Sequence, residues 1–151
     1  MIGADVARFY RAFPYPQYPL LQRPRWRGGY VGSPAFAATL RDETLRFSPS
    51  SAAPLCGGRT LVAGCGDTLP YILGKWSGPR DEITCLDISK LSLRRARLRT
   101  WGLTPRFQFQ CADIDQYLHR RNQLSPAEKK FDHVDAFGVL HHLPNPAETL
   151  K

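Results

Sequence analysis

The chain has 151 residues, 42% hydrophobic and 23% charged, which are ordinary proportions for one globular domain with a real core. No apolar run approaches the roughly 20 residues that a membrane-spanning helix requires, and no secretory leader is recognisable, so we expect a cytoplasmic protein without a membrane partner, with organelle import as a minor alternative. The formal net charge of +8 admits an acidic partner such as nucleic acid but does not identify one.

The cysteines argue against a metal centre. None of Cys56, Cys65, Cys85 and Cys111 forms a C-x-x-C pair or stands at ligand spacing from a histidine. We therefore expect no metal site, and reduced thiols of the kind found in a cytosol-like compartment. Three of the four stand at or near the ends of expected strands, where a small buried thiol is the simplest interpretation.

The first 58 residues are expected to form an N-terminal arm, a helix and a linker. Residues 1–35 are rich in Pro, aromatics and Arg, and prolines at positions 14, 16, 19 and 24 interrupt both a helix and a central strand. We expect this irregular arm to run extended, either as a strap on the domain or as a lid over a substrate site. Apolar spacing predicts a helix over residues 34–47, and composition predicts a linker over 48–58.

From residue 59 to residue 151, short apolar strands alternate with helices. Strands are expected over residues 60–63, 82–86, 107–111 and 131–139, and helices over 69–77, 90–101 and 114–120, with another opening at Asn145. Strands separated by helices, without hairpin signals, indicate βαβ units. We therefore predict an α/β domain with a Rossmann-like, doubly wound and mostly parallel sheet. Ligands bind such sheets outside the carboxyl ends of the strands.

The helix over residues 90–101 is the most basic element. Ser89 is its expected N-cap, and Gly102 is expected to end it. The apolar residues expected to point partly inward are Leu91, Leu93, Leu98 and Trp101. The arginines expected on the outside are Arg94, Arg95, Arg97 and Arg99. Because Arg pairs with phosphate and stacks on bases, these arginines and the arm would form the contact surface of a nucleic-acid-binding module.

A glycine turn follows the first strand, in the stretch RTLVAGCGDTLPY. Glycine at such a turn either adopts a positive φ or lets another group approach the backbone closely. Leu69 stands where the dinucleotide fingerprint G-x-G-x-x-G needs its third glycine, and the Lys-Ser or Lys-Thr of a phosphate-cradling loop is absent. Asp67 would repel a pyrophosphate but tolerate a cation. The expected ligand therefore approaches Gly64 and Gly66 and has no pyrophosphate.

Two acids end the next two strands. Asp87 ends the second strand, and its ionised carboxylate could accept hydrogen bonds from both hydroxyls of a ribose. Asp113 ends the third strand and is placed to accept from an exocyclic amine. A nucleoside with an amino base fits both acids, whereas the alternative interpretation of each acid is a helix N-cap.

Four stretches together carry a family resemblance. LVAGCGDT, ITCLDIS, FQCADI and FDHVDAFGVLHHLPNP resemble, in order and spacing, the successive motifs of class I S-adenosylmethionine-dependent methyltransferases over residues 59–151. The resemblance implies S-adenosyl-L-methionine as cofactor, with the glycine turn along its methionine part, the first acid on its ribose, the second acid on its adenine, and a valine at the floor of the methyl-transfer site. The implied cofactor-binding residues are Gly64, Cys65, Gly66, Asp87, Ile88, Asp113, Ile114 and Val139.

The implied function is methyl transfer to an acceptor that the sequence does not identify. His141 and His142 follow the fourth strand and could take a proton from a nucleophile, but polar residues at a helix start are the simpler interpretation, so no catalytic residue is assigned. The alternatives are a non-catalytic methyltransferase-like domain and a basic nucleic-acid-binding module. A nicotinamide-dependent oxidoreductase is disfavoured because the third glycine is missing.

The fourth strand raises a question of partners. In the resembled family the sheet continues with three more strands, so here the expected strand 131–139 would be left at an edge. A hydrophobic edge strand is prone to pair with another chain. We therefore expect a sheet truncated after its fourth strand, and self-association through that strand.

Overall fold

A computed structural model describes residues 2–13, 18–20, 22, 57–121, 123 and 130–149. The expected helix over 34–47, Cys56 and most of the expected linker lie outside the described residues. The predicted boundary between the N-terminal region, residues 1–58, and the domain, residues 59–151, stays a prediction.

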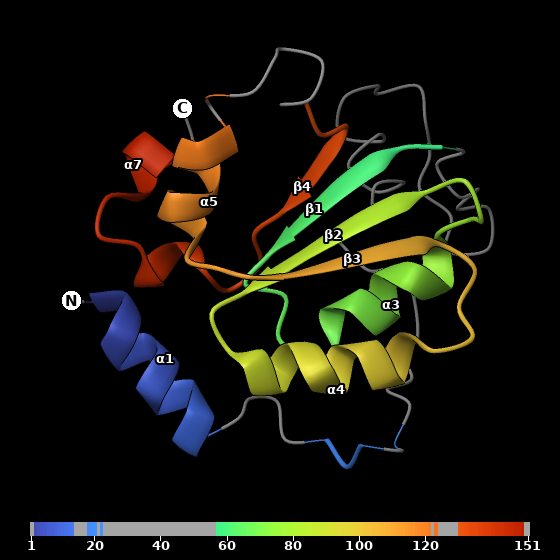
Figure 1. The fold of residues 1–151 in the computed structure, drawn as a ribbon, viewed down its shortest axis with the longest axis horizontal. Coiled ribbons are helices and arrows are strands. Elements are labelled where there is room, and N and C mark those ends of the chain that lie inside the picture. The colour runs from blue at the N-terminus through green and yellow to red at the C-terminus, as the bar shows by residue number, and fades with distance from the viewer. Residues whose placement is uncertain are drawn as a thin grey trace, which may run out of the picture.

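A parallel sheet of four strands forms the centre of the described structure. The strands are β1 (Arg59–Ala63), β2 (Glu82–Asp87), β3 (Arg106–Cys111) and β4 (His133–Asp135), in the order β3-β2-β1-β4. All three neighbouring pairs are parallel, so every strand ends at the same edge, as Figure 1 shows. The predicted α/β fold is confirmed.

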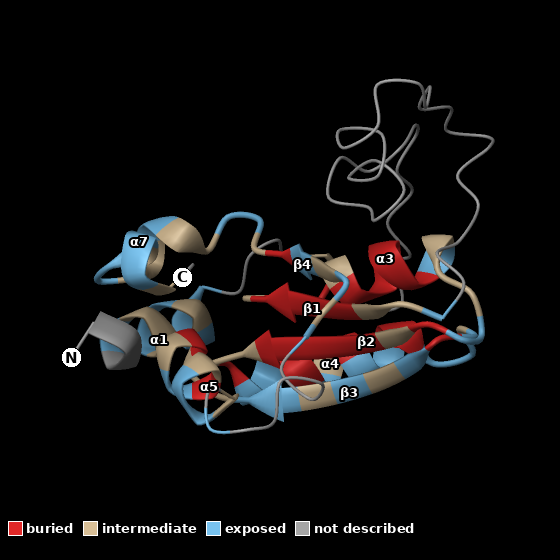
Figure 2. Cartoon of the chain, turned by 90° about the horizontal axis from the view of Figure 1, so that it is seen from above, coloured by how far each residue is buried: buried red, intermediate tan, exposed pale blue. Residues whose placement is uncertain are grey.

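Helices pack against both faces of the sheet, and its central strands β1 and β2 are largely buried (Figure 2). These helices are α3 (Leu69–Trp76), α4 (Lys90–Thr100), α5 (Ile114–Arg121) and the short α7 (Pro146–Thr149), with a 3₁₀ turn, η1 (Leu140–His142), after β4. Apolar side chains of α3 and α4 join one core cluster with β1 and β2, and those of α5 join the other. The sheet is therefore doubly wound, as expected.

The two core clusters explain why β1 is apolar at successive positions. Val62 packs toward α3 and α4, together with Ile83 and Cys85 of β2, whereas Leu61 and Ala63 pack toward α5. A parallel strand covered on both faces has no solvent side, so each of its side chains is selected for burial. This is the physical reason for the uninterrupted run of small apolar residues before the glycine turn.

The helix boundaries follow local signals that the sequence carries. Thr68 precedes α3 with Pro70 in the first turn, where a missing N–H costs no helical bond. Ser89 caps α4, its hydroxyl accepting from the Ser92 N–H at 3.2 Å. Gly102 follows α4 with a φ of +83°, the left-handed geometry that favours glycine after a helix.

The first element was not expected. Residues Ile2–Ala12 form a helix, α1, whereas the sequence interpretation made the whole arm extended. The first proline stands at position 14, so the eleven residues of α1 precede it and are free to form helical hydrogen bonds. Figures 1 and 2 both place α1 beside the carboxyl edge of the sheet.

The fourth strand is shorter than predicted. β4 covers three residues, whereas residues 131–139 were expected to be extended. The carboxylate of Asp135 accepts a hydrogen bond from the Phe137 N–H at 3.0 Å, and Gly138 has a φ of +70°. A short polar side chain that binds its own backbone two residues on turns the chain, and a left-handed glycine completes the reversal.

The orientation of α4 also corrects a prediction. Leu93 and Ala96 are buried, but Leu98 and Trp101, which were expected to point inward, are 55% and 83% exposed. Arg99, expected on the outside, is 6% exposed. Because a residue five positions along a helix lies on the opposite side, burial of Leu93 carries Leu98 to solvent.

Across the described ranges, no helix is both long and apolar enough to cross a bilayer.

Candidate functional site

The candidate site lies at the carboxyl edge, where the predicted residues follow four neighbouring strands. β1 leads into the glycine turn, β2 ends at Asp87, β3 leads to Asp113 and β4 to Val139. The pairing Asp87↔Cys111 and a 3.2 Å bond from the Ala112 N–H to the Asp87 carbonyl keep the ends of β2 and β3 together. The structure therefore brings the predicted residues to one edge.

Gly64 allows both a turn and a close approach. Its φ is +65°, and a Cβ added there would lie 2.6 Å from Cγ2 of Val139. Real Cβ atoms do not come so close to another carbon, so only glycine leaves room for the valine. The group that approaches this backbone in the described structure is thus the side chain expected at the floor of the transfer site.

Gly66 connects the turn to the acid of β2. With a φ of +57°, its N–H donates to Oδ2 of Asp87 at 2.8 Å, and the Ser89 N–H donates to Oδ1 at 2.7 Å. An ionised carboxylate has about four acceptor positions, so one bond on each oxygen leaves capacity for two further donors. The carboxylate is held in place on one side and can still accept on the other.

The half-buried position of Asp87 affects its protonation. Burial raises the pKa of the Asp87 carboxyl above its ordinary value, since the charged form loses hydration. The N–H groups of Ser89 and Gly66 oppose the shift because they stabilise the charged form, and the nearby charge of Asp67 adds to it. A ligand that donates hydrogen bonds to this carboxylate would stabilise the ionised form.

Asp113 combines the two roles that the sequence left open. Its Oδ1 accepts from the Asp115 N–H at 2.9 Å and so caps the start of α5. Within the described part of the chain its Oδ2 accepts no hydrogen bond and can take a ligand amine. Ile114 is the first residue of α5, and a first-turn N–H has no partner inside its own helix.

The remaining two predicted residues contribute less of their side chains. Cys65 is 1% exposed, and its thiol lies in the core beside Cys85, where burial raises the pKa of the thiol well above its ordinary value. Only the backbone of Cys65 is therefore suited to line a ligand. Ile88, directly after β2, is half-buried.

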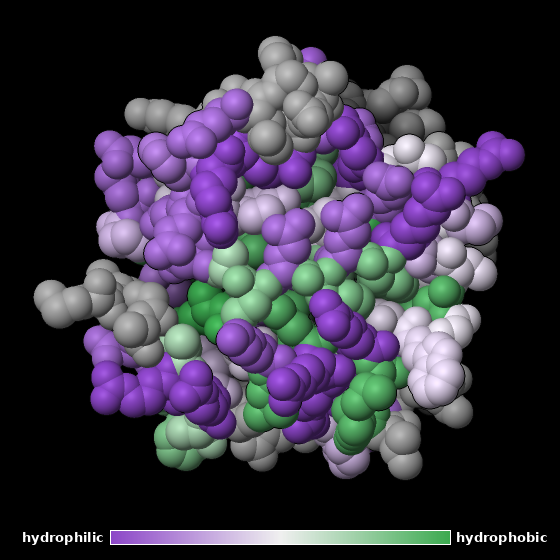
Figure 3. Space-filling model, in the orientation of Figure 1, coloured by the Kyte–Doolittle hydropathy of each residue, from purple (hydrophilic) through white to green (hydrophobic). Residues whose placement is uncertain are grey.

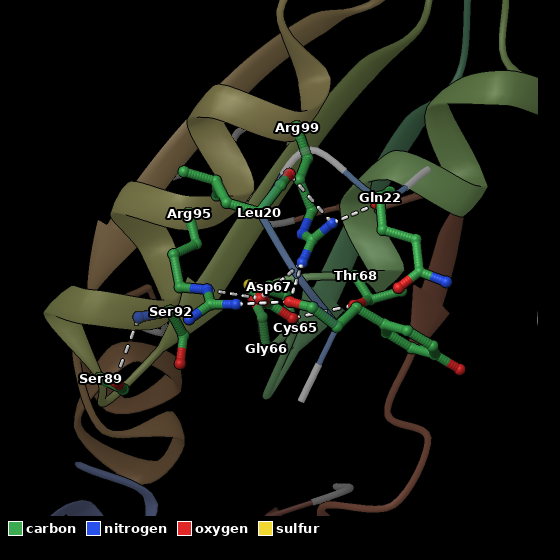
Figure 4. Close-up of polar contacts among 11 residues, drawn as sticks. Leu20, Gln22, Cys65, Gly66, Asp67, Thr68, Ser89, Ser92, Arg95 and Arg99 are labelled. Carbon is green, nitrogen blue, oxygen red and sulfur yellow. Dashed lines mark hydrogen bonds and ion pairs between the residues drawn. The ribbon is translucent and has the colours of Figure 1, made fainter. Parts of the chain in front are cut away.

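Asp67 has a different role from the one expected. The sequence interpretation left its carboxylate available to a cationic ligand, but the residue is 5% exposed and accepts from Thr68 Oγ1 at 2.8 Å and Arg95 Nε at 2.8 Å. Nη2 of Arg99 lies 3.2 Å from the same carboxylate oxygen that binds Arg95 (Figure 4). The cations that Asp67 pairs with are thus two side chains of α4.

Sequence reasoning missed a contact between opposite ends of the chain. The Tyr10 hydroxyl of α1 is hydrogen-bonded to Nε2 of His142 in η1 at 2.9 Å, and the ring of His141 lies 3.8 Å from that of His142. Burial and the charge of His141 lower the pKa of His142. No local sequence pattern predicts this contact, because the two residues are 132 positions apart.

The part of the chain that the structure describes contains no group of three or more His, Cys, Asp or Glu residues arranged to hold a metal ion.

Solved structures with a similar fold include two methyltransferases. An arsenic (III) S-adenosylmethionine methyltransferase from Chlamydomonas reinhardtii aligns with 78% of this chain and 43% of its own, with a TM-score of 0.53 and 23% identity. Magnesium protoporphyrin IX methyltransferase from Synechocystis, solved with bound SAH, covers 95% of this chain and 61% of its own, with a TM-score of 0.50 and 16% identity. At these identities the likeness establishes the fold.

Sequence comparison extends the agreement to the family. An uncharacterized protein of Synechococcus is 32% identical over 148 residues, which are 93% of this chain and 31% of that protein, so the chain spans about a third of its curated relative. The family model described as "Methyltransferase domain" matches residues 61–151, the same stretch that carries the glycine turn and both acids. The class I resemblance is thereby confirmed, and the chain belongs to the methyltransferase domain family.

Proposed function

We propose that this chain binds S-adenosylmethionine at the carboxyl edge of its sheet and takes part in methyl transfer to an acceptor. The family and the fold support S-adenosylmethionine as the cofactor. The assignment of individual residues to that cofactor is our proposal.

The observation that carries the proposal is the arrangement of Asp87. Both carboxylate oxygens are oriented by backbone N–H groups, one from the glycine turn and one from the start of α4, and both retain acceptor capacity. A nucleoside ribose offers two adjacent hydroxyl donors, which match two oriented oxygens. S-adenosylmethionine therefore fits these residues, because its ribose hydroxyls can donate to Asp87 oxygens that are already oriented.

The other residues follow from this placement. Asp113 Oδ2 and the Ile114 N–H would bind the adenine edge, with Ile88 against the base. The backbone of the turn Gly64, Cys65 and Gly66 would lie along the methionine part, beside Val139.

The chemistry requires little acid–base catalysis from the chain. S-adenosylmethionine supplies a methyl group on a sulfonium that is already activated as a leaving group. The residues of this edge would bind the nucleoside, align the methyl carbon and exclude water. His142, whose pKa is lowered and whose Nε2 is bonded to Tyr10, is given no catalytic role.

Isothermal titration calorimetry of the parent chain tests the proposal. S-adenosylhomocysteine should bind with a saturable heat, and NADH should give none. Binding of NADH with no heat from S-adenosylhomocysteine would contradict it. A non-catalytic domain of the same family would also bind S-adenosylhomocysteine. It would not convert S-adenosylmethionine to S-adenosylhomocysteine with any acceptor in a screen.

The nucleic-acid alternative loses part of its contact surface. Two of the four arginines on which it depends, Arg95 and Arg99, are bonded to Asp67 and to backbone carbonyls. Hydrophobic side chains also stand among hydrophilic ones on the face that includes α4 (Figure 3), where Leu91 and Leu98 are exposed. A steep loss of oligonucleotide affinity with rising salt would favour this alternative.

The cytoplasmic location stays a prediction.

A further inference from the structure

Two arginines of α4 bind a segment of the N-terminal arm. Nη1 of Arg99 donates to the carbonyl of Gln22 at 2.6 Å and to that of Leu20 at 3.3 Å, and its Nη2 donates to the Tyr18 carbonyl at 2.9 Å. Nη2 of Arg95 donates to the same Tyr18 carbonyl at 2.6 Å. A single guanidinium thus collects three carbonyls of one short segment, which only the forked donor set of Arg can do.

The same two guanidiniums bind the end of the glycine turn. Arg95 Nε and Arg99 Nη2 lie 2.8 Å and 3.2 Å from Oδ2 of Asp67, and the side chains of Arg99 and Asp67 are 2% and 7% exposed. Buried charges need partners in place of water, and the carbonyls of the arm supply acceptors for the Nη atoms of both arginines, although Nε of Arg99 has no partner among the described residues. Figure 4 shows both arginine side chains converging on Asp67, with Leu20 and Gln22 of the arm beside Arg99.

The cluster is connected to the proposed cofactor site through one residue, Gly66. Asp67 follows Gly66, and the Gly66 N–H is a donor that orients the Asp87 carboxylate. A displacement of Asp67 would therefore rotate the Gly66 N–H away from Asp87. The left-handed φ of Gly66 makes this peptide easy to displace, since glycine has other conformations of similar energy.

We propose that Arg95 and Arg99 are positioning residues: by joining Tyr18, Leu20 and Gln22 of the arm to Asp67, they hold the glycine turn in the conformation that presents Asp87 to the cofactor. This inference rests on the proposed function, and it gives the arm a part in cofactor binding. Arg95 and Arg99 contact no reacting atom and act through Asp67 and Gly66.

Binding of S-adenosylhomocysteine to matched variants tests the proposal. Arg95 is the better site because its side chain is 27% exposed, so Arg95→Gln is expected to fold. If this change reduces the competent fraction of the turn to a tenth, the apparent Kd rises about tenfold. Arg99→Lys, which keeps the charge but loses the fork, should also raise the Kd, and Arg94→Gln, on the exposed side of α4, should leave it unchanged.

A double-mutant cycle separates positioning from general stability. Asp67→Asn should raise the Kd by a similar factor, and Asp67→Asn combined with Arg95→Gln should raise it no further than one change does, because both act on the same turn. Each Kd is measured at a temperature where circular dichroism shows the variant folded. An unchanged Kd in Arg95→Gln, or effects that multiply in the double variant, would overturn the proposal even if its Tm fell.

Hydrogen exchange provides a readout that needs no ligand. The Gly66 amide should exchange faster in Arg95→Gln and in Arg99→Lys than in the parent, and at the parent's rate in Arg94→Gln. If the parent failed to bind S-adenosylhomocysteine while these rates behaved as expected, the proposed function would fail and the contact between arm and turn would stand. Unchanged Gly66 exchange in both variants would refute the positioning role itself.

Discussion

Single residues at the carboxyl edge serve the fold and still keep acceptor positions for the proposed ligand. Asp113 caps α5 with Oδ1 and leaves Oδ2, and Asp87 uses one acceptor position on each oxygen. The sequence treated cap and ligand as alternatives for these acids. The structure shows that they are compatible, because a carboxylate has more acceptor positions than a cap requires.

Removing the Asp87 carboxylate should weaken cofactor binding. Asp87→Ala is expected to reduce the affinity for S-adenosylhomocysteine by about 1.5–3 kcal/mol, the range for hydrogen bonds to a charged group, and Asp87→Glu should have a milder effect. Calorimetry gives both values. Glu82→Ala, at the other end of β2 in an exposed ion pair with Arg106, is the matched control and should bind like the parent. If Asp87→Ala bound the cofactor as tightly as the parent, Asp87 would have only a structural role, in the hydrogen bonds to Gly66 and Ser89.

The raised pKa of Asp87 predicts a pH dependence. A folded-state pKa above the unfolded value means that the fold binds this proton more tightly, so this group's contribution to stability falls as pH rises from the unfolded pKa to the raised one. Ribose donors favour the ionised form, so affinity should rise through the same window, with proton release on binding. Titrations in buffers of different ionisation enthalpy measure that release. Asp87→Asn should release no proton on binding in this pH window. A release equal to that of the parent would show that the proton comes from a group other than Asp87.

At the scale of elements, the turn after β1 and the chain after β4 are fitted to each other. Val139 occupies the space that a side chain at position 64 would need, and it also packs against the core cluster under α5. The sequence predicted a glycine requirement at this turn but assigned the close approach to a ligand. The valine lies 75 residues later, and no local pattern reports such a contact.

Gly64→Ala should therefore be more destabilising than an ordinary glycine substitution. The left-handed φ alone costs about 1–2 kcal/mol for alanine, and the contact with Val139 adds to it. Gly102→Ala is the control, since its φ is +83° but no atom lies within 4 Å of the added Cβ. Urea unfolding should show the larger loss for Gly64→Ala, with part of it recovered in Gly64→Ala/Val139→Ala. Equal losses at the two glycines would show that Val139 moves aside freely.

The helix α4 shows how a periodic pattern can be assigned to the wrong side. Apolar residues occur on two sides of this helix, and the sequence does not say which side meets the sheet. Leu93, Ala96 and Thr100 are buried, so the side that carries Leu91 and Leu98 faces solvent. Arg99 is also buried, and it reaches Asp67 together with Arg95.

For the whole molecule, the end strand β4 predicts self-association. Among the described strands it pairs with β1 alone; Val134 within β4 is 51% exposed, and Phe137, two residues after the strand, is 61% exposed. Exposed apolar side chains on an end strand favour pairing with another chain. Light scattering should show dimers or larger species whose proportion rises with concentration.

The substitution Val134→Lys should lower that proportion, because a charge on an end strand opposes pairing. Leu98→Lys, an exposed leucine on α4, is the control and should leave the proportion unchanged. A parent chain that stayed monomeric at every concentration would contradict the prediction, and an effect of Leu98→Lys equal to that of Val134→Lys would move the interface to α4.

The sequence alone determined the alternation of strands and helices, the parallel sheet, the glycine turn and the placement of both acids at one edge. These follow from local periodicity and from the rule that parallel strands end together. Tertiary structure decided the partners of Asp67, the inward direction of Arg99 and the pairing of Tyr10 with His142, which joins residues 132 positions apart. Such contacts depend on which surfaces meet when the elements pack. A buried charge requires an opposite charge or a hydrogen-bonding group nearby, and the tertiary fold decides which group that is.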